Sequence, residues 1–218
     1  MTDISITPAE RRRLKVRDSI IAAAERVFAE EGEAGLSIRR LAKKIDYSPA
    51  AIYKYFASKD DLVDELKDAF FDRLLTQIHR IADKETPFSA RMADCLATYV
   101  KEGLSSPHHY AAAFVGTARD TGLDASHPDF AQQSKGRAFR VLMGMMAEGI
   151  ELGHFRKDLD PELAAKSIWA SLHGLTMMMI HIPTYPRLSA DSEAPDRETF
   201  IQIHADHLVR GLESRNDS

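Results

Sequence analysis

The side chains best suited to recognition chemistry between residues 37 and 59 are the hydrogen-bond donors Arg39, Tyr53, Lys54 and Lys59. Guanidinium and ammonium groups pair with phosphate oxygens, and together with phenols they donate to base edges in a DNA groove. The chain has no GxSxG, P-loop or GxGxxG motif, which would instead indicate a catalytic or nucleotide-binding site. These residues therefore favour contact with nucleic acid over catalysis.

Two short helices joined by a tight turn are expected to position these donors. The Ser37 hydroxyl can cap the first helix by accepting an orphan amide proton of its opening turn. The turn follows at residues 46–47. Four apolar residues at helical spacing share one face of the first helix, which must be buried: Ile38, Leu41, Ala42 and Ile45.

The second helix begins directly after the turn. Ser48 can cap it, and Pro49 occupies its first position, where a missing N–H costs nothing. Ile52 and Phe56 lie four residues apart and point back at the first helix. The opposite side is narrow enough to enter a major groove about 12 Å wide, as a recognition helix does. It carries Pro49, Ala50, Ala51, Tyr53 and Lys54.

A third helix begins at Ser58, which can cap it in a capping box with Asp61. Lys59 lies at this helix end, where amides and an ammonium can hold one phosphate together. We expect Arg39, Tyr53 and Lys54 to contact bases or phosphates, and Pro49, Ala50 and Ala51 to permit close approach. Four residues are expected to fix register on the DNA backbone: Ser37, Ser48, Tyr55 and Lys59. For Tyr55, packing inside the protein is a nearly equal alternative.

The run from Ile20 to Leu62 resembles the DNA-binding domain of TetR-type bacterial transcriptional regulators. Its core is GEAGLSIRRLAKKIDYSPAAIYKYFASKDDL. The Leu-Ser opening, the Ile-Tyr-x-Tyr-Phe close and the Ser-Lys-Asp-Asp-Leu exit all stand at the spacing of that family, over about the first quarter of the chain. One departure is Asp46, where the family usually has glycine. Asp tolerates the left-handed backbone of such a turn better than most residues do.

Charge is unevenly divided along the 218 residues. The net charge is −4, but residues 1–60 hold 12 Lys and Arg against 9 Asp and Glu, while the remainder holds 17 against 24. A basic N-terminal part on an acidic remainder would orient the protein with its N-terminal part toward a DNA duplex. The single Cys95 cannot form an internal disulfide and is expected to be a small buried residue, which fits a reducing cytoplasm.

Three segments divide the chain. Residues 1–10 are expected to be a disordered tail, residues 11–57 the helix-turn-helix DNA-binding domain, and residues 58–218 a helical body for ligand binding and dimerisation. The arginine-rich segment at 11–17 reaches phosphates or an adjacent minor groove in one interpretation and is a solvated helix start in the other. The apolar run behind it is too short for a signal peptide.

The rest of the chain predicts helices near residues 58–80, 88–104, 111–118, 130–152, 161–183 and 197–212. A turn is expected at 105–110 and a loop at 121–129. No strand signal competes, so the sequence predicts an all-α protein of about nine helices. The apolar stretch at 168–182 contains Ser171, His173, Gly174 and His181, which indicates a buried helix and no membrane span.

The last two long helices are apolar on more than one side, which predicts a partner outside the subunit. A homodimer through a four-helix bundle would let two recognition helices read a pseudo-palindrome in double-stranded DNA, and the TetR resemblance implies the same. Residues 169–174 also resemble a TetR subgroup with a Trp-x-x-x-His-Gly pattern. The residues expected in the interface are Leu172, Met179, Phe200, Ile203, His204, His207, Leu208 and Leu212.

The TetR resemblance further implies a pocket in the middle helices for a small hydrophobic or amphipathic effector. Methionines would give such a pocket adaptable walls. For each candidate alone, plain core packing is the commoner role. The candidates are Phe70, Phe71, Met92, Tyr99, Tyr110, Phe114, Phe139, Met143, Met146, Trp169, His173 and Met177.

Other classes of function stay open beside a ligand-released repressor. A constitutive DNA-binding or architectural protein would lack an effector, and a helical enzyme would need a titratable cluster in the body, which the sequence does not show. Two pairs among the nine histidines are candidate metal ligands, because imidazoles at close spacing can bind one ion. These pairs are His108 with His109 and His204 with His207. No HExxH motif and no cysteine partner accompany them, so no metal and no cofactor are expected.

Overall fold

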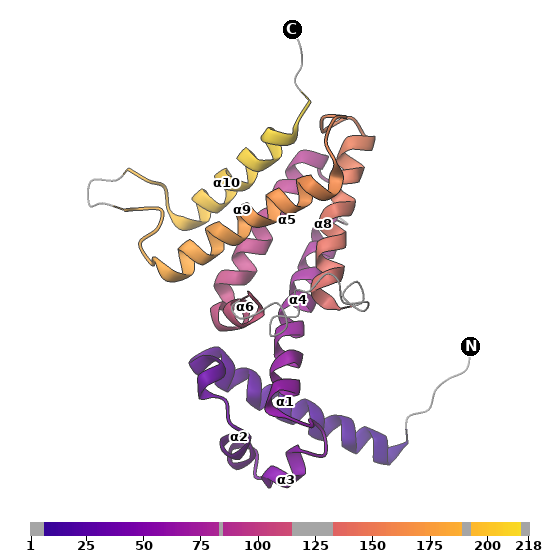
Figure 1. Ribbon diagram of the computed structural model, residues 1–218, viewed down its shortest axis with the longest axis vertical. Coiled ribbons are helices and arrows are strands. Elements are labelled where there is room, and N and C mark those ends of the chain that lie inside the picture. The colour runs from indigo at the N-terminus through magenta and orange to yellow at the C-terminus, as the bar shows by residue number, and fades with distance from the viewer. Residues whose placement is uncertain (1–6, 83–84, 115–132, 189–192, 215–218) are drawn as a thin grey trace.

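The computed structural model describes residues 7–82, 85–114, 133–188 and 193–214, and their regular structure consists of nine helices (Figure 1). The predicted all-α fold of about nine helices is confirmed. The helices are α1 (Pro8–Gly35), α2 (Ile38–Lys44), α3 (Pro49–Ile52), α4 (Lys59–Ala82), α5 (Phe88–Ser105), α6 (Pro107–Phe114), α8 (Ser134–Glu151), α9 (Pro161–His181) and α10 (Arg197–Leu212).

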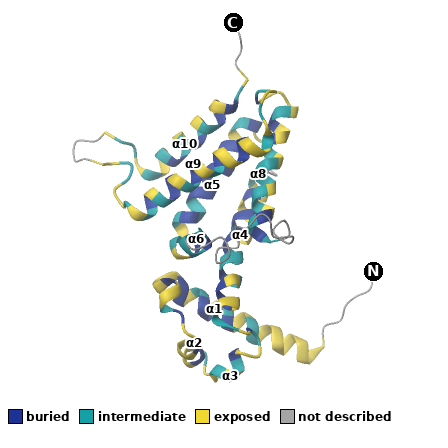
Figure 2. Cartoon of the chain, viewed as in Figure 1, coloured by how far each residue is buried: buried dark blue, intermediate teal, exposed yellow. Residues whose placement is uncertain are grey.

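The head is built from α1, α2, α3 and the first turns of α4, which share one apolar core. Its centre is formed by residues such as Phe28, Leu41 and Ile52, all at most 1% exposed. Leu62 and Leu66 of α4 belong to the same core, so the head extends past the boundary expected at residue 57. Figure 2 shows these buried faces turned toward one another around an exposed rim.

The body consists of α5, α6, α8, α9, α10 and the remainder of α4, around a second and larger core. Helix α10 packs on α5, and α8 packs on both α4 and α9. Helix α4 rises out of the head and continues between the body helices, so it is a direct strut between the two cores (Figure 1).

Helix α1 begins at Pro8, inside the segment expected to be a disordered tail. Thr7 forms a capping box with Glu10: its hydroxyl accepts from the Glu10 amide, and the Glu10 carboxylate accepts from the Thr7 amide at 2.8 Å. This local pair stabilises a helix end that lacks any apolar periodicity. The expectation for residues 7–10 was therefore wrong, and residues 1–6 lie outside the described part.

The turn expected at 105–110 is much shorter than predicted. Helix α5 ends at Ser105, and α6 starts at Pro107, because proline is pre-organised for a first helical position. Helix α6 thus takes in His108, His109 and Tyr110 and begins four residues before the start expected at 111. The rest of that helix, the loop at 121–129 and residues 130–132 lie outside the described residues.

Candidate nucleic-acid interface and ligand pocket

Both helices of the helix-turn-helix are capped as the sequence predicts. The Ser37 hydroxyl accepts from the Arg40 amide and the Ser48 hydroxyl from the Ala51 amide, each at 3.2 Å. Between them Asp46 adopts φ 56°, the left-handed conformation, and the next amide, of Tyr47, donates to the Ala42 carbonyl at 2.9 Å. This bond closes α2 as in a Schellman motif and fixes the angle at which α3 leaves.

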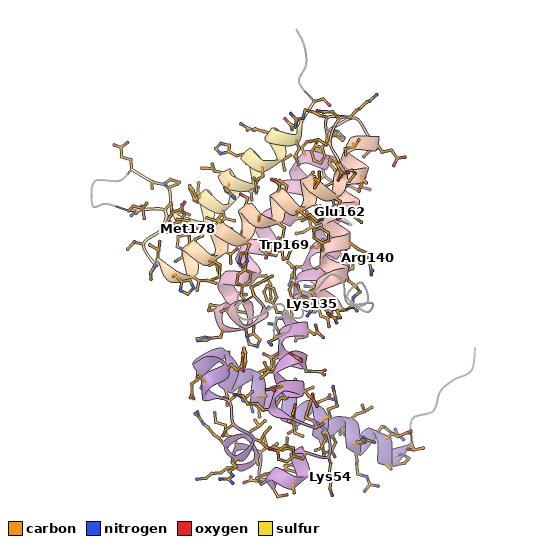
Figure 3. All side chains as sticks on the ribbon, viewed as in Figure 1. Lys54, Lys135, Arg140, Glu162, Trp169 and Met178 are labelled. Atoms are coloured by element: carbon orange, nitrogen blue, oxygen red, sulfur yellow. The ribbon has the colours of Figure 1, made fainter. Side chains whose placement is uncertain are left out.

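The donors expected on the second helix lie directly after it, because α3 ends at Ile52 and Tyr53 and Lys54 belong to the turn that follows. Tyr53 is 53% exposed, and Lys54 lies at the tip of the head, away from the body (Figure 3). Arg39 on α2 is also exposed. Of the small residues, Ala50 is exposed, while Pro49 and Ala51 are half-buried. This surface therefore combines exposed hydrogen-bond donors with small side chains at 49–51, which suits a DNA groove.

Two other cations of the motif hold the head together. The Arg40 guanidinium pairs with both carboxylate oxygens of Glu31, and this pairing lowers the pKa of Glu31. The Lys59 ammonium donates to the Glu33 carbonyl at 3.0 Å. Both therefore bind the end of α1, where Gly32 turns the chain with φ 67°. The phosphate contact of Lys59 stays a prediction, and in this structure Lys59 ties α4 to α1.

A groove beside α3 brings the arginine-rich start of α1 next to the recognition helix. Arg12 and Arg13 line it together with Lys54 and the half-buried Tyr55. Sequence reasoning identified the arginines but could not place them, because their position depends on how α1 crosses the head. The three cations form a continuous basic edge next to the exposed end of α3.

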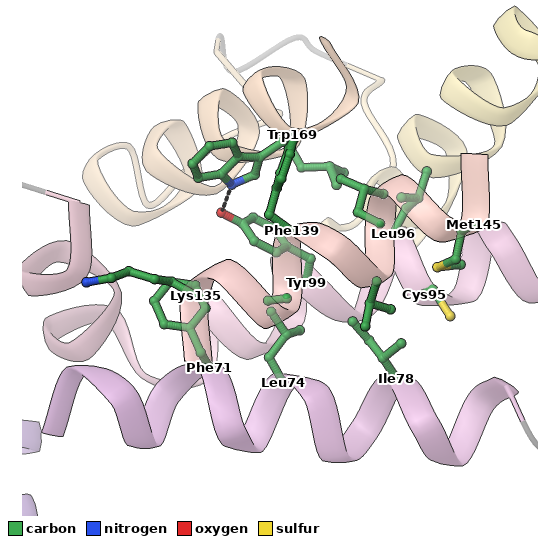
Figure 4. Close-up of a pocket in the computed structure, with 14 residues that line it drawn as sticks. Phe71, Leu74, Ile78, Cys95, Leu96, Tyr99, Lys135, Phe139, Met145 and Trp169 are labelled. Atoms are coloured by element: carbon green, nitrogen blue, oxygen red, sulfur yellow. Dashed lines mark hydrogen bonds between the residues drawn. The ribbon is translucent and has the colours of Figure 1, made fainter. Parts of the chain in front are cut away.

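An apolar pocket lies in the body between α4, α5, α8 and α9 (Figure 4). Its volume is about 60 Å³, well below the roughly 300–1,000 Å³ of typical small-molecule sites, so a ligand must move the surrounding side chains or helices apart to enter. Fourteen residues line it: Phe71, Leu74, Ile78, Cys95, Leu96, Tyr99, Lys135, Ala138, Phe139, Val141, Leu142, Met145, Trp169 and Leu172.

The structure places four of the twelve candidates in this wall, namely Phe71, Tyr99, Phe139 and Trp169. The other eight do not line it; for Phe70 the reason is that neighbouring residues on a helix point about 100° apart. Phe70 turns into the core beside Phe71, and Met92 lines an adjoining cavity. The remaining candidates pack in the core or at its edge: Tyr110, Phe114, Met143, Met146, His173 and Met177.

Sequence reasoning missed ten residues of the wall, including Leu74, Leu96 and Lys135. Most are aliphatic side chains whose helical spacing is the same for a pocket as for a core, so no signal in the sequence separates them. Leu172 was assigned to the dimer interface, yet it is 2% exposed and lines the pocket from α9.

A chain of hydrogen bonds runs from the pocket wall into the core. Trp169 Nε1 donates to the Tyr99 hydroxyl at 2.9 Å, this hydroxyl lies 3.0 Å from that of Tyr110, and the Tyr110 hydroxyl lies 2.7 Å from His173 Nδ1. Burial raises the pKa of Tyr110 to about 12, raises that of Tyr99 and lowers that of His173. All four groups are therefore uncharged near neutral pH. The spacing of Trp169 and His173 puts both on the inner side of α9.

Four helices meet in a charged cluster where the head joins the body. Arg73 of α4 bridges Glu25 of α1 at 3.5 Å and Glu102 of α5 at 3.2 Å. His109 of α6 is 2% exposed, with its Nε2 2.5 Å from Glu25 and its ring 4.8 Å from Phe28. Burial raises the pKa of Glu25, but contacts with His109 and Arg73 outweigh this effect and lower it overall. Glu25 is thus an ionised anchor for α1.

The outer face of α9 and α10 is open within the subunit. Met178 is 41% and Ile203 37% exposed, and a Cβ added at Gly174 or Gly211 would meet no atom within 4 Å. His204, His207 and Leu208 share this face, and Phe200 is half-buried at its start against Tyr185. Three assignments were wrong because these side chains pack inside their own subunit: Leu172, Met179 and Leu212.

The described residues hold no group of three His, Cys, Asp or Glu side chains that could bind a metal ion. His204 contacts Ser171 at 3.1 Å, and His109 is occupied at the head–body junction. Cys95 is buried, as the sequence predicts. No helix in the described parts of the chain is both long and apolar enough to cross a bilayer.

Comparisons with known proteins agree with this architecture. Residues 20–66 match the family of bacterial regulatory proteins, tetR family, and residues 79–199 match the tetracyclin repressor-like C-terminal domain. The chain is 28% identical over 163 residues to the HTH-type transcriptional repressor KstR2 of Mycobacterium tuberculosis, covering 72% of this chain and 79% of that one. It is 26% identical over 156 residues to the fatty acid metabolism regulator protein of Bacillus subtilis, covering 70% and 77%.

Solved structures share the fold. The fatty acid degradation regulator FadR from Bacillus halodurans superposes with a TM-score of 0.70 at 20% identity, covering 91% of this chain and 97% of that one. FadR from Bacillus subtilis in complex with stearoyl-CoA gives 0.61 at 21%, covering 90% and 99%. With the C-terminal model matching more than half of its length and the helix-turn-helix in place, this chain belongs to the TetR family of DNA-binding transcriptional regulators.

Proposed function

We propose that this chain is a non-catalytic, homodimeric repressor of the cytoplasm that leaves a pseudo-palindromic operator when a small apolar or amphipathic molecule enters the body pocket. Residues 11–57, with the first turns of α4, form the DNA-binding unit, and the rest of residues 58–218 binds the ligand and the second subunit. The observation that carries the proposal is the physical connection of the exposed α3 to an apolar pocket through one continuous helix, α4.

DNA recognition is assigned to the exposed end of α3 and the adjoining basic edge. Tyr53 and Lys54 reach bases or phosphates, Arg39 approaches from α2, and the small side chains at 49–51 permit close contact. Ser37, Ser48, Tyr55 and Lys59 fix register on the backbone. Arg12 and Arg13 lengthen the phosphate-binding edge, because they line the same groove as Lys54.

Salt-dependent binding tests this assignment. Each phosphate contact removed should make the fall of log K with log salt concentration less steep by about 1. We expect Lys54→Ala and Arg13→Ala each to weaken binding to a selected operator duplex in this way. Arg80→Ala, on the exposed face of α4 in the body, is the matched control and should bind as the parent does. Parental affinity of Lys54→Ala at physiological salt would exclude Lys54 from the DNA-binding surface.

The exposed face of α9 and α10 is assigned to the dimer. Two glycines without neighbours, Gly174 and Gly211, allow close approach of a second copy, and Ile203, Leu208 and Met178 supply apolar contact. An isologous interface of this kind gives the two-fold symmetry that a palindrome requires. Two half-sites would then be read about 34–36 Å apart.

The ligand class follows from the wall of the pocket and from relatives. KstR2 is described as a ketosteroid transcriptional regulator, and FadR of Bacillus subtilis was solved with stearoyl-CoA. Both names indicate molecules with a large apolar part, and the wall of this pocket is almost entirely aliphatic and aromatic. Entry of such a molecule would favour one arrangement of α4 and so change the spacing of the two heads.

Filling the pocket by mutation tests the role of the ligand. Ala138 lines the pocket, whereas Ala147 is exposed on the same helix. We expect stearoyl-CoA or a ketosteroid to release the operator from the parent and from Ala147→Phe, but not from Ala138→Phe, as measured by anisotropy of labelled duplex. Unchanged DNA affinity of the parent with every compound would support a constitutive DNA-binding protein instead.

A further inference from the structure

The pocket offers very few polar groups to a ligand. Among the side chains of its wall, only Tyr99, Lys135 and Trp169 carry nitrogen or oxygen. In Figure 4 the amine of Lys135 points away from the other labelled side chains, whereas the Tyr99 hydroxyl meets the Trp169 indole. A polar atom of a ligand inside the pocket would therefore meet the Tyr99 hydroxyl and the Trp169 indole.

The donors in this part of the wall are already in use. Trp169 Nε1–H donates to the Tyr99 oxygen. With His173 neutral and its proton on Nε2, Tyr110 donates to Nδ1, and Tyr99 donates to the oxygen of Tyr110. A ligand that donates could use a free lone pair of Tyr99 and leave the chain intact. A ligand that can only accept hydrogen bonds needs a donor, and each donor here already donates to another group.

Rotation of one hydroxyl is the least costly way to satisfy an accepting ligand. The Tyr99 hydroxyl can turn its proton from Tyr110 to the ligand, while Trp169 continues to donate to Tyr99. A charged acceptor would lose its hydration in a largely apolar interior, which is unfavourable. Among accepting ligands, the chemistry of the wall thus favours an uncharged one, such as a ketone, ester or thioester carbonyl.

Tyr110 connects this event to the head because its neighbour in α6 is His109. The two side chains leave α6 on different sides: Tyr110 joins the pocket network, and His109 contacts Glu25 and Phe28 of α1. Tyr110 is also held tightly, since a Cβ added at Gly103 would lie 2.9 Å from its ring. A change in the bonding of Tyr110 is therefore carried by α6 as a whole.

We propose that Tyr99 recognises an uncharged hydrogen-bond acceptor on the ligand, and that loss of its bond to Tyr110 is transmitted through α6 to the contact of His109 with α1. This inference rests on the proposed function, because it assigns the polar chemistry and the signal of the same pocket. It makes Tyr99 the residue for ligand specificity and Tyr110 a positioning residue for the head.

Matched ligands test the recognition step. Trp169 is the chain's one tryptophan and lines the pocket, so its fluorescence reports occupancy. Binding of 2-undecanone and of undecane is measured for the parent, Tyr99→Phe and Tyr110→Phe. We expect the ketone-to-alkane affinity ratio to fall about fivefold in Tyr99→Phe, as for one lost hydrogen bond, and not to fall in Tyr110→Phe.

The outcomes separate the two proposals. An unchanged ratio in Tyr99→Phe would overturn recognition by Tyr99 while leaving a ligand-binding pocket. Binding of neither compound to the parent, together with no operator release by any compound tried, would count against the proposed function itself.

Hydrogen exchange of the ligand-free protein tests transmission. Tyr110→Phe removes the bonds to Tyr99 and His173 but keeps the ring, so α6 should hold α1 less firmly. We expect amide exchange across residues 25–35 to rise about fivefold in Tyr110→Phe. Tyr185→Phe is the control, because Tyr185 is half-buried near Phe200 at the start of α10. Equal exchange in the two variants would overturn the role of α6.

Discussion

Arg73 offers the sharpest test of how the head is held on the body. Its guanidinium lies between Glu25 of the head and Glu102 of the body, at 3.5 Å and 3.2 Å. The Arg73 side chain is 39% exposed, while those of Glu25 and Glu102 are 26% and 14% exposed. Because solvent screens the pair only partly, each contact contributes up to about 1 kcal/mol. Arg73→Met keeps much of the aliphatic stem but leaves two half-buried carboxylates without this cation.

The expected loss follows from these contacts. Two ion pairs and the poorer solvation of the remaining acids together give a destabilisation of about 2 kcal/mol. For a chain of this length this corresponds to a decrease in melting temperature of about 4–8 °C. Urea unfolding at fixed protein concentration measures it, with hydrogen exchange of α1 as a local readout.

Arg80→Met is the control for this substitution. Arg80 lies on the exposed face of the same helix, where its guanidinium contacts Gln77 at 3.5 Å. It should change stability by less than about 0.5 kcal/mol. Equal effects of the two substitutions would refute the account of Arg73 as the bridge between head and body.

Three further predictions concern the turn at Asp46, the half-buried His173 and the dimer. Asp46→Gly should raise the free energy of unfolding by about 0.5–1 kcal/mol, because glycine adopts φ 56° without steric cost. Asp46→Val should lower it, and urea unfolding measures both changes. The opposite order of the two variants would contradict a left-handed turn. Burial lowers the pKa of His173 in the folded state below its unfolded value of about 6.5. The folded protein therefore keeps its full stability above about pH 6.5, where His173 is neutral in both states. It loses part of that stability as the pH falls from about 6.5 toward the folded pKa, because the unfolded state binds the proton more readily. His173→Asn keeps an acceptor for Tyr110 and should show a shallower loss of melting temperature between neutral and mildly acidic pH; an identical pH profile would rule out this origin. Ile203→Glu with Leu208→Glu should yield folded monomers in light scattering, because charge on the open α10 face opposes close approach of a second copy, and a persisting dimer would place the interface elsewhere.

Local features of the fold were predictable because short-range interactions decide them. Ser37, Ser48 and Asp160 cap their helices, with hydroxyl or carboxylate oxygens accepting from amides three residues on. Gly153 ends α8 with φ 77°, as its position after an apolar helix indicates. The turn at Asp46 was readable for the same reason.

The placement of side chains between helices was less predictable. Phe70 and Phe71 are chemically identical neighbours, yet one is core and the other lines the pocket. Leu172 and Met179 face inward although α9 is apolar on several sides, because periodicity does not say which apolar face meets a helix of the same subunit. Lys59 shows the same limit for charge, since its ammonium finds the Glu33 carbonyl across the fold.

The direct measurement of the central claim is selection of bound duplexes from a random DNA pool by the purified protein, sequenced and repeated at two salt concentrations. A dimeric reader should enrich a palindromic motif with half-site centres about 34–36 Å apart, and Lys54→Ala should weaken binding to it. Absence of any enriched motif, with binding that only fades as salt rises, would leave non-specific electrostatic attraction and contradict the account.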